Sequence, residues 1–164
     1  MPLHVLFLCT GNSARSILAE ALLNYRGGGQ VRAFSAGSRP AGAVHPMALQ
    51  ILQEYGVPAD GLRSKSWDEF GVTTASAMDV VITVCDNAAK ETCPIWPGAP
   101  VSAHWGIKDP VAVKGTDADQ RRAFVRAFRE LDARVEAFLR LPFDTLDRAL
   151  LKRELDAIGR MTRR

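Results

Sequence analysis

An apolar run near the start of the chain leads directly into a short polar loop that begins with a cysteine. Residues 3–8 read LHVLFL, which predicts a buried strand, and residues 15–26 place apolar side chains at helical spacing. A strand, a tight loop and a helix in this order are typical of a parallel α/β sheet. Such sheets bind ligands at the carboxyl ends of their strands, so the loop CTGNSAR at residues 9–15 lies where a binding site is expected.

The composition of this loop predicts a reactive thiol beside an anion site. Backbone N–H groups and the positive end of a helix together favour a tetrahedral oxyanion and lower the pKa of a cysteine. We therefore expect Cys9 to be a nucleophilic thiolate near neutral pH, and Arg15 to hold two oxyanion oxygens with its planar guanidinium. The alternative is that Cys9 is an inert core residue. The residues expected to bind the oxyanion are Thr10, Gly11, Asn12, Ser13, Ala14, Arg15 and Ser16.

The rest of the chain continues to alternate between strands and helices. Strands are predicted at residues 3–8, 31–36, 78–84 and 101–104, and helices at residues 15–26, 45–55, 66–70, 118–141 and 145–161. This order predicts an α/β fold with a four-stranded parallel sheet flanked by helices. We expect one domain over residues 1–164, in which residues 142–164 form a C-terminal helical extension. Cys9, Cys85 and His104 lie at or near strand ends, so we expect them to line one crevice.

The composition argues against several classes of protein. Of the 164 residues, 47% are hydrophobic and 24% are charged, which suits a globular domain with a full core. The first apolar run is too short for a signal sequence or a membrane span, so we expect a cytoplasmic protein with no membrane partner. The net charge of +3 is accompanied by no nucleic-acid-binding motif, and we expect no nucleic-acid partner. Three cysteines in a cytoplasmic chain indicate catalysis or redox chemistry over a structural disulfide.

Several segments together resemble one known family. A cysteine and an arginine separated by five residues, with Ser16 next, come directly after the first predicted strand. Further landmarks are Ser35-Ala36-Gly37, the run VVITVC at residues 80–85, and HWGIKDP at residues 104–110. These features resemble the low-molecular-weight protein tyrosine phosphatase superfamily, which also contains thiol-dependent arsenate reductases. The resemblance covers nearly the whole chain and implies the fold of that superfamily.

The resemblance also implies a general acid at Asp109. A thiolate that attacks a phosphorus or arsenic centre expels an oxygen, and that oxygen needs a proton. In the family an Asp-Pro pair supplies it, and here the pair is Asp109-Pro110. Pro110 restrains Asp109 to an extended conformation, which helps to aim the carboxyl group. From the residues alone, the alternative is an Asp-Pro pair that opens a turn.

The two activities of the superfamily differ after the first displacement. A phosphatase hydrolyses its phosphocysteine, whereas a reductase releases arsenite when a second thiol attacks the cysteine–arsenic adduct. Cys85 and Cys93 could form a thiol relay, in which Cys85 attacks Cys9 and Cys93 then closes a disulfide with Cys85. Residues 111–113, VAV, follow the pair Asp109-Pro110, where related tyrosine phosphatases usually carry tyrosines. The sequence therefore resembles the arsenate reductase branch.

The expected function is thiol-dependent reduction of arsenate to arsenite through a covalent Cys9 adduct. The alternatives are a low-molecular-weight protein tyrosine phosphatase that hydrolyses phosphotyrosine, and a binding module that holds an oxyanion without catalysis. The expected partners are an arsenate or phosphate-like oxyanion and an external thiol reductant, which is either thioredoxin or glutathione with glutaredoxin. No tightly bound cofactor is expected.

Some relatives hold a monovalent ion beside the loop with oxygen ligands. The resemblance therefore implies a potassium site, since neutral and carboxylate oxygens suit that ion. The corresponding residues are Asn12, Glu20, Ser35, Ser66 and Asp68. No cluster of histidine and cysteine has the spacing of a zinc site.

Overall fold

A four-stranded parallel sheet forms the centre of the molecule. The computed structural model describes residues 2–71, 77–85 and 99–161. The strands are β1 (Leu3–Leu8), β2 (Val31–Ala36), β3 (Val80–Thr83) and β4 (Val101–His104), and their order in the sheet is β2-β1-β3-β4. The central strand β1 pairs in parallel with both neighbours, and Phe7 lies opposite Ser35 on one side and Ile82 on the other. The carboxyl ends of the strands therefore meet at one edge, as expected of this fold class.

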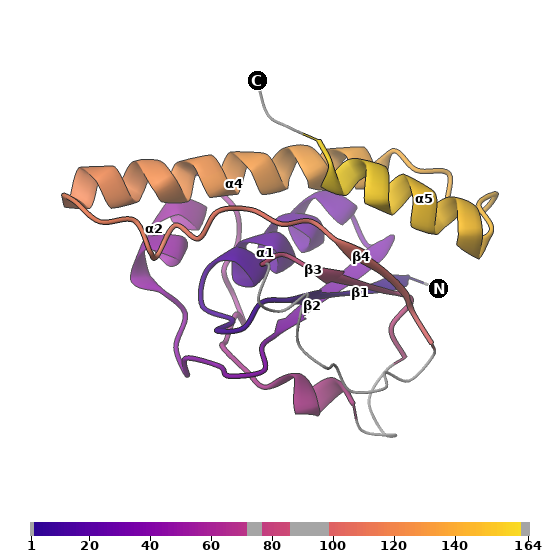
Figure 1. Ribbon diagram of the computed structural model, residues 1–164, viewed down its shortest axis with the longest axis horizontal. Coiled ribbons are helices and arrows are strands. Elements are labelled where there is room, and N and C mark those ends of the chain that lie inside the picture. The colour runs from indigo at the N-terminus through magenta and orange to yellow at the C-terminus, as the bar shows by residue number, and fades with distance from the viewer. Residues whose placement is uncertain (1, 72–76, 86–98, 162–164) are drawn as a thin grey trace.

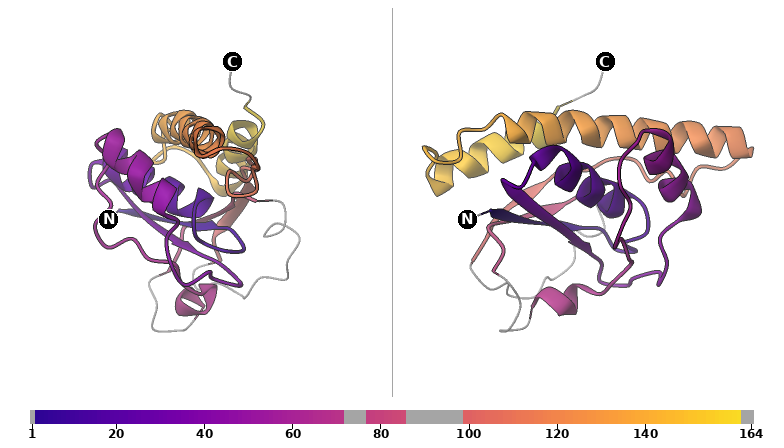
Figure 2. Two further views of the ribbon diagram at one scale, coloured as in Figure 1. Left: turned by 90° about the vertical axis from the view of Figure 1, so that its left-hand side faces the viewer. Right: turned by 180° about the vertical axis from the view of Figure 1, so that it is seen from behind.

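Helices flank this sheet, and the predicted fold class is confirmed. The described helices are α1 (Arg15–Gly27), α2 (Pro46–Glu54), the short 3-10 helix η1 (Trp67–Phe70), α4 (Asp117–Leu139) and α5 (Arg148–Gly159). Figures 1 and 2 show α1, α4 and α5 on one side of the sheet and η1 on the opposite side. Aromatic side chains fill the layer between the sheet and the long helix α4. The Trp105 ring lies 6.0 Å from that of Phe7 and 6.1 Å from that of Phe138.

The ends of the two C-terminal helices follow from their capping residues. The Thr116 side chain accepts a hydrogen bond from the Asp119 N–H, and the Asp119 side chain accepts one from the Thr116 N–H, which makes a capping box at the start of α4. The Asp147 side chain accepts from the Leu150 N–H and starts α5. Within the described residues, no helix combines the length and the apolar character needed to cross a membrane.

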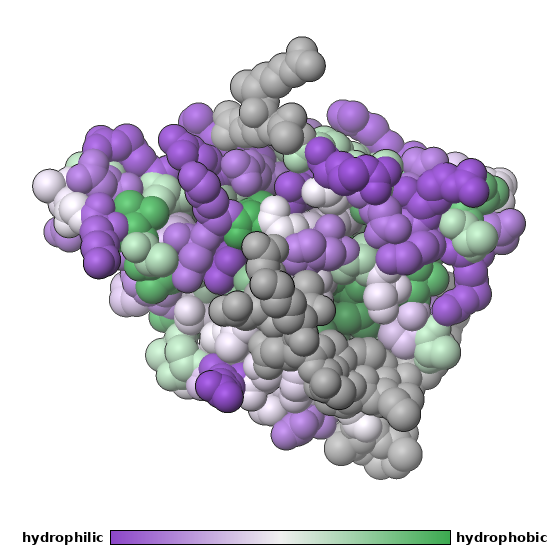
Figure 3. Space-filling view, in the orientation of Figure 1, coloured by the Kyte–Doolittle hydropathy of each residue, from purple (hydrophilic) through white to green (hydrophobic). Residues whose placement is uncertain are grey.

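The C-terminal helix α5 lies against the edge strand β4. The Trp105 Nε1 donates to the Leu155 carbonyl at 3.0 Å, and the Lys152 ammonium donates to the Ser102 carbonyl at 2.6 Å. Gly159 approaches so closely that an added Cβ would lie 2.2 Å from the His104 carbonyl oxygen. The predicted C-terminal helix therefore covers an edge strand and buries the tryptophan that follows it. Figure 3 shows that the visible faces of α4 and α5 are mostly hydrophilic.

Candidate active site

The loop after β1 holds its carbonyl groups outward. Three of them accept hydrogen bonds from the segment at residues 39–45. The N–H groups of Arg39, Ala41 and His45 donate to the carbonyls of Thr10, Gly11 and Ser13, at 3.0, 2.9 and 2.9 Å. In a trans peptide, the next N–H points away from the carbonyl, so the N–H groups of Gly11, Asn12 and Ala14 point toward the inside of the loop. This is the arrangement that binds an oxyanion with backbone groups.

Asn12 fixes the shape of the loop from within. It is fully buried and has a φ of 44°, a left-handed conformation that asparagine tolerates better than most residues. Its Nδ2 donates to the Ser16 and Ser35 hydroxyls at 2.8 and 2.9 Å, and its Oδ1 accepts from the Lys65 N–H at 2.9 Å. The side-chain amide thus ties the loop to α1, to β2 and to the segment before η1.

The Ser35-Ala36-Gly37 landmark supports the loop through its glycine. A Cβ added to Gly37 would lie 2.4 Å from the Thr10 carbonyl oxygen and 2.5 Å from that of Cys9. The Gly37 N–H donates to the Lys65 carbonyl at 3.0 Å, and its carbonyl accepts from the Trp67 N–H at 2.9 Å. The glycine therefore lets the chain after β2 pass directly against the backbone of the candidate nucleophile.

The thiols of Cys9 and Cys85 are buried together at the end of β1 and β3. Both are free thiols, and they share a hydrogen bond that raises the pKa of Cys9. Burial raises that pKa further, whereas the Arg15 guanidinium and the Gly11 N–H lower it. The predicted lowering of the Cys9 pKa is therefore wrong for this arrangement, because the neighbouring thiol and burial outweigh the loop and Arg15.

Cys85 also contacts the oxyanion loop itself. The Thr10 N–H donates to the Cys85 Sγ at 3.4 Å, and the Thr10 hydroxyl lies 3.8 Å from the same sulfur. A second thiol is thus held against both the candidate nucleophile and the backbone of its anion loop. Proximity of this kind is what thiol–disulfide exchange requires.

Arg15 and Asp109 lie close together at the mouth of the site. The Arg15 Nη2 is 3.5 Å from the Asp109 Oδ2, and the Arg15 Nη1 donates to the Ile107 carbonyl at 3.1 Å. The Asp109 Oδ1 accepts from the Val111 N–H at 2.9 Å, which orients the carboxyl group at the start of the turn. The two charged residues predicted from the sequence therefore come from distant segments to one place, where Asp109 remains 40% exposed.

Arg134 in α4 holds the segment that carries Asp109 and was not predicted. It is buried, and burial lowers its pKa. Its Nη1 donates to the Gly106 carbonyl at 3.2 Å, and its Nη2 donates to the Met161 carbonyl at 3.3 Å. An arginine in the middle of an amphipathic helix usually faces water, so the sequence carries no signal for this role.

The remaining predicted residues are Cys93, His104 and the potassium ligands. Cys93 lies outside the described residues. His104 ends β4 and pairs with the Thr83 hydroxyl at 2.7 Å. Of the predicted potassium ligands, Asn12, Glu20 and Ser35 form one hydrogen-bonded chain, in which the Ser35 hydroxyl donates to the Glu20 carboxylate.

The other two predicted potassium ligands form the start of η1. The Ser66 hydroxyl accepts from the Asp68 N–H at 3.1 Å, and Asp68 is exposed. An unpredicted residue, Lys65, lies beside Glu20. Within the described part of the chain, no group of three or more histidine, cysteine, aspartate and glutamate side chains is arranged to hold a metal ion.

Known proteins share both the sequence pattern and the fold. The low molecular weight phosphotyrosine protein phosphatase family matches residues 4–155. An arsenate reductase of Halalkalibacterium halodurans is 34% identical over 134 residues, which cover 82% of this chain and 93% of that protein. A structure of an arsenate reductase in the phosphate binding state superposes with a TM-score of 0.65 at 26% identity, over 84% of this chain and 96% of that one.

A second solved structure is longer than this chain. The thioredoxin-dependent arsenate reductase of Corynebacterium glutamicum superposes with a TM-score of 0.61 at 29% identity. The match covers 82% of this chain and 59% of the Corynebacterium chain.

Proposed function

This chain belongs to the low molecular weight phosphotyrosine protein phosphatase family, and we propose that it reduces arsenate to arsenite. The observation that carries this proposal is the buried Cys85 thiol, which contacts both Cys9 and the Thr10 N–H of the anion loop. Hydrolysis of a phosphocysteine uses one thiol. Reduction of an arsenic adduct needs a second thiol in contact with the first, and the Cys85 thiol is in contact with Cys9.

In the first step, the Cys9 thiol gives its proton to the bound arsenate dianion, and the resulting thiolate attacks the arsenic atom. A sulfur–arsenic bond forms, an arsenic–oxygen bond breaks, and the departing oxygen takes a proton from Asp109 and leaves as water. Arg15 exchanges its contact with Asp109 for two oxygens of the oxyanion, and its planar guanidinium stabilises the negative charge. The loop N–H groups of Gly11, Asn12 and Ala14 bind the remaining oxygens.

In the second step, the Cys85 thiolate attacks the Cys9 sulfur. A disulfide bond forms, the sulfur–arsenic bond breaks, and its electron pair stays on arsenic, which leaves as arsenite. Cys93 then attacks Cys85, which releases the Cys9 thiolate and forms a Cys85–Cys93 disulfide. The two electrons that reduce arsenic come from the Cys85 and Cys93 thiols, which end as a disulfide.

An external dithiol or thiol must reduce the Cys85–Cys93 disulfide before the next turnover. We favour thioredoxin, because it reduces a disulfide within a chain and because the Corynebacterium relative is named as thioredoxin-dependent. Glutathione with glutaredoxin is the alternative. The relay needs reduced thiols, and we therefore place the protein in the cytoplasm.

The test is arsenite production from arsenate by the purified protein, with thioredoxin and its reductase in one series and glutathione with glutaredoxin in the other. We expect multiple turnovers with thioredoxin and none from Cys9→Ser in either series. Arsenate reduction that persists in Cys9→Ser would overturn the assignment. Efficient hydrolysis of phosphotyrosine without arsenite formation under either reductant would replace it with the phosphatase function.

A further inference from the structure

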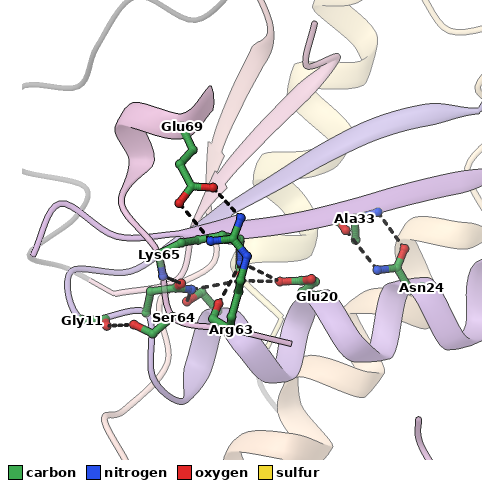
Figure 4. A network of polar contacts seen from close by, with 11 residues as sticks. Gly11, Glu20, Asn24, Ala33, Arg63, Ser64, Lys65 and Glu69 are labelled. Atoms are coloured by element: carbon green, nitrogen blue, oxygen red, sulfur yellow. Dashed lines mark hydrogen bonds and ion pairs between the residues drawn. The ribbon is translucent and has the colours of Figure 1, made fainter. Parts of the chain in front are cut away.

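A buried ion pair lies behind the anion loop. Glu20 extends from α1 and Lys65 from the segment before η1, with the Lys65 Nζ 3.6 Å from the Glu20 Oε1. Their side chains are 13% and 6% exposed. Figure 4 shows this pair together with Arg63, whose guanidinium pairs with Glu69 at the surface. The Lys65 ammonium also donates to the Arg63 carbonyl at 2.9 Å, so it is held in place from two sides.

Hydrogen bonds connect this pair to the shape of the loop. The Glu20 carboxylate accepts from the Ser35 hydroxyl, which in turn accepts from the Asn12 amide. The Lys65 N–H donates to the other end of the same amide, at the Asn12 Oδ1. The Ser64 hydroxyl, next to Lys65, donates to the Gly11 carbonyl at 3.3 Å, a contact drawn in Figure 4. The backbone and the charge of Lys65 therefore act on one residue, the left-handed Asn12.

The buried Glu20 carboxylate needs a positive charge beside it. The Lys65 ammonium, itself 6% exposed and 3.6 Å from the Glu20 Oε1, supplies that charge from within the protein. Loss of that positive charge would leave a buried carboxylate unpaired, which is far costlier than the pair is worth. The carboxylate would then turn away toward water, and the Ser35 hydroxyl would lose its acceptor.

The residues predicted to bind potassium do not fit that ion here. The Asn12 Oδ1 is taken by the Lys65 N–H, and the Asn12 Nδ2 faces Ser35, so the amide presents a donor to the other predicted ligands. Ser66 and Asp68 contact each other at the start of η1. Only the Glu20 carboxylate and the Ser35 hydroxyl remain together, and an ammonium group lies against that carboxylate.

We propose that Lys65 is a built-in cation that takes the place of a potassium ion and acts as a positioning residue for oxyanion binding. Its ammonium balances the charge of Glu20, the Glu20 carboxylate accepts from the Ser35 hydroxyl, and that hydroxyl accepts from the Asn12 amide. This chain of contacts keeps Asn12 in the conformation that directs the loop N–H groups inward. Binding and turnover of an oxyanion by this chain are therefore independent of potassium. Lys65 acts here on oxyanion binding by the loop, so phosphate binding, and not arsenate reduction, tests its role.

The experiment measures phosphate affinity by calorimetry, and kcat and KM for para-nitrophenyl phosphate, in potassium, sodium and choline chloride at equal ionic strength. The wild type should give the same values in all three salts. In choline, Lys65→Ser should lose about tenfold to a hundredfold in phosphate affinity, the scale on which an outer partner of a binding site acts. Potassium should restore most of this affinity. The shorter serine side chain leaves space for the ion beside Glu20, and its hydroxyl adds an oxygen ligand.

A matched control is Lys152→Ser, which removes an exposed lysine of α5 whose partners are Asp156 and the Ser102 carbonyl and not residues of the anion loop. It should bind phosphate like the wild type in every salt. A second variant, Glu20→Gln with Lys65→Met, removes both charges, so it should regain part of the affinity lost in Lys65→Ser and show no response to potassium. This double variant tests the same idea if Lys65→Ser folds poorly in choline.

Three results would overturn the proposal. The first is a wild-type protein whose phosphate affinity rises with potassium. The second is a Lys65→Ser variant that binds phosphate as well as the wild type in choline. The third is a Lys65→Ser defect that is relieved neither by potassium nor by the Glu20→Gln and Lys65→Met pair. Failure to produce arsenite would instead contradict the proposed function and leave these phosphate measurements unaffected.

Discussion

At the scale of single residues, the Cys9 thiol is subject to opposing influences. The Arg15 guanidinium and the Gly11 N–H favour its thiolate, whereas the Cys85 thiol and burial favour the neutral form. The sequence predicts the two favourable influences, because both belong to the loop itself. It does not predict the balance, which depends on a thiol 76 positions away that the parallel pairing of β1 and β3 brings into contact.

Replacement of Cys85 should therefore make Cys9 more acidic. In Cys85→Ala, the influence that raises the Cys9 pKa most is absent, so the pKa should fall and the thiolate should form at lower pH. The measurement is the rate of Cys9 alkylation by iodoacetamide against pH, with Cys9→Ser as the blank. The midpoint should move to lower pH relative to the wild type. An unchanged or higher midpoint would show that Cys85 does not control this thiol.

Asp109 is the second residue whose role can be tested alone. Asp109→Asn keeps the hydrogen bond from the Val111 N–H but cannot donate the proton, so the rate should fall about a hundredfold. The loss should be larger for phenyl phosphate than for para-nitrophenyl phosphate, because a poorer leaving group needs the proton more. Equal losses for the two substrates would mean that Asp109 acts only through its contact with Arg15.

At the scale of elements, the strand–loop–helix unit could be predicted and its supports could not. Apolar periodicity identifies β1 and α1, and the short polar run between them identifies the loop. The carbonyl-binding segment at residues 39–45 and the lysine at position 65 have no such pattern. Their positions depend on a crossover that pairs Gly37 with Ser66, a long-range contact that local sequence does not specify.

Gly37 tests how closely these elements must approach. In Gly37→Ala, the new Cβ would meet two backbone carbonyl oxygens at 2.4 and 2.5 Å, so the loop must move. A displacement of about 1 Å in a loop that positions the reacting groups costs about a hundredfold in rate. The measurement is kcat/KM for para-nitrophenyl phosphate. Gly27→Ala is the control, because its Cβ meets only the Val31 side chain, at 3.3 Å. Wild-type kinetics in Gly37→Ala would contradict the close approach.

At the scale of the whole molecule, α5 closes the edge of the sheet and contacts the segment that leads to Asp109. The extension and its helical character follow from the sequence, but its docking site does not, because apolar spacing shows which face is buried and not what covers it. In the structure, the Trp105 indole donates to the Leu155 carbonyl of α5. Arg134 donates both to the Met161 carbonyl, just after α5, and to the Gly106 carbonyl. The segment that leads to Asp109 is therefore supported by α5 and by Met161.

Gly159 is the contact at which this docking can be weakened. Gly159→Ala places a Cβ 2.2 Å from the His104 carbonyl, so α5 should shift and the free energy of unfolding should fall by about 1–3 kcal/mol. Urea unfolding followed by tryptophan fluorescence measures the change, since Trp105 is fully buried beneath α5. A midpoint equal to that of the wild type would show that α5 does not pack as tightly as described.

In the proposed mechanism, the buried Cys85 thiol completes the arsenate reduction that Cys9 begins. The most direct measurement is a single turnover with arsenate and no reductant, followed by arsenite quantification and peptide mapping of the disulfides. The relay predicts one equivalent of arsenite per chain and a Cys85–Cys93 disulfide. Cys85→Ser should give neither, although it should still hydrolyse para-nitrophenyl phosphate. A Cys85→Ser variant that releases arsenite as the wild type does, or a wild type that releases arsenite with all three cysteines still reduced, would contradict the relay.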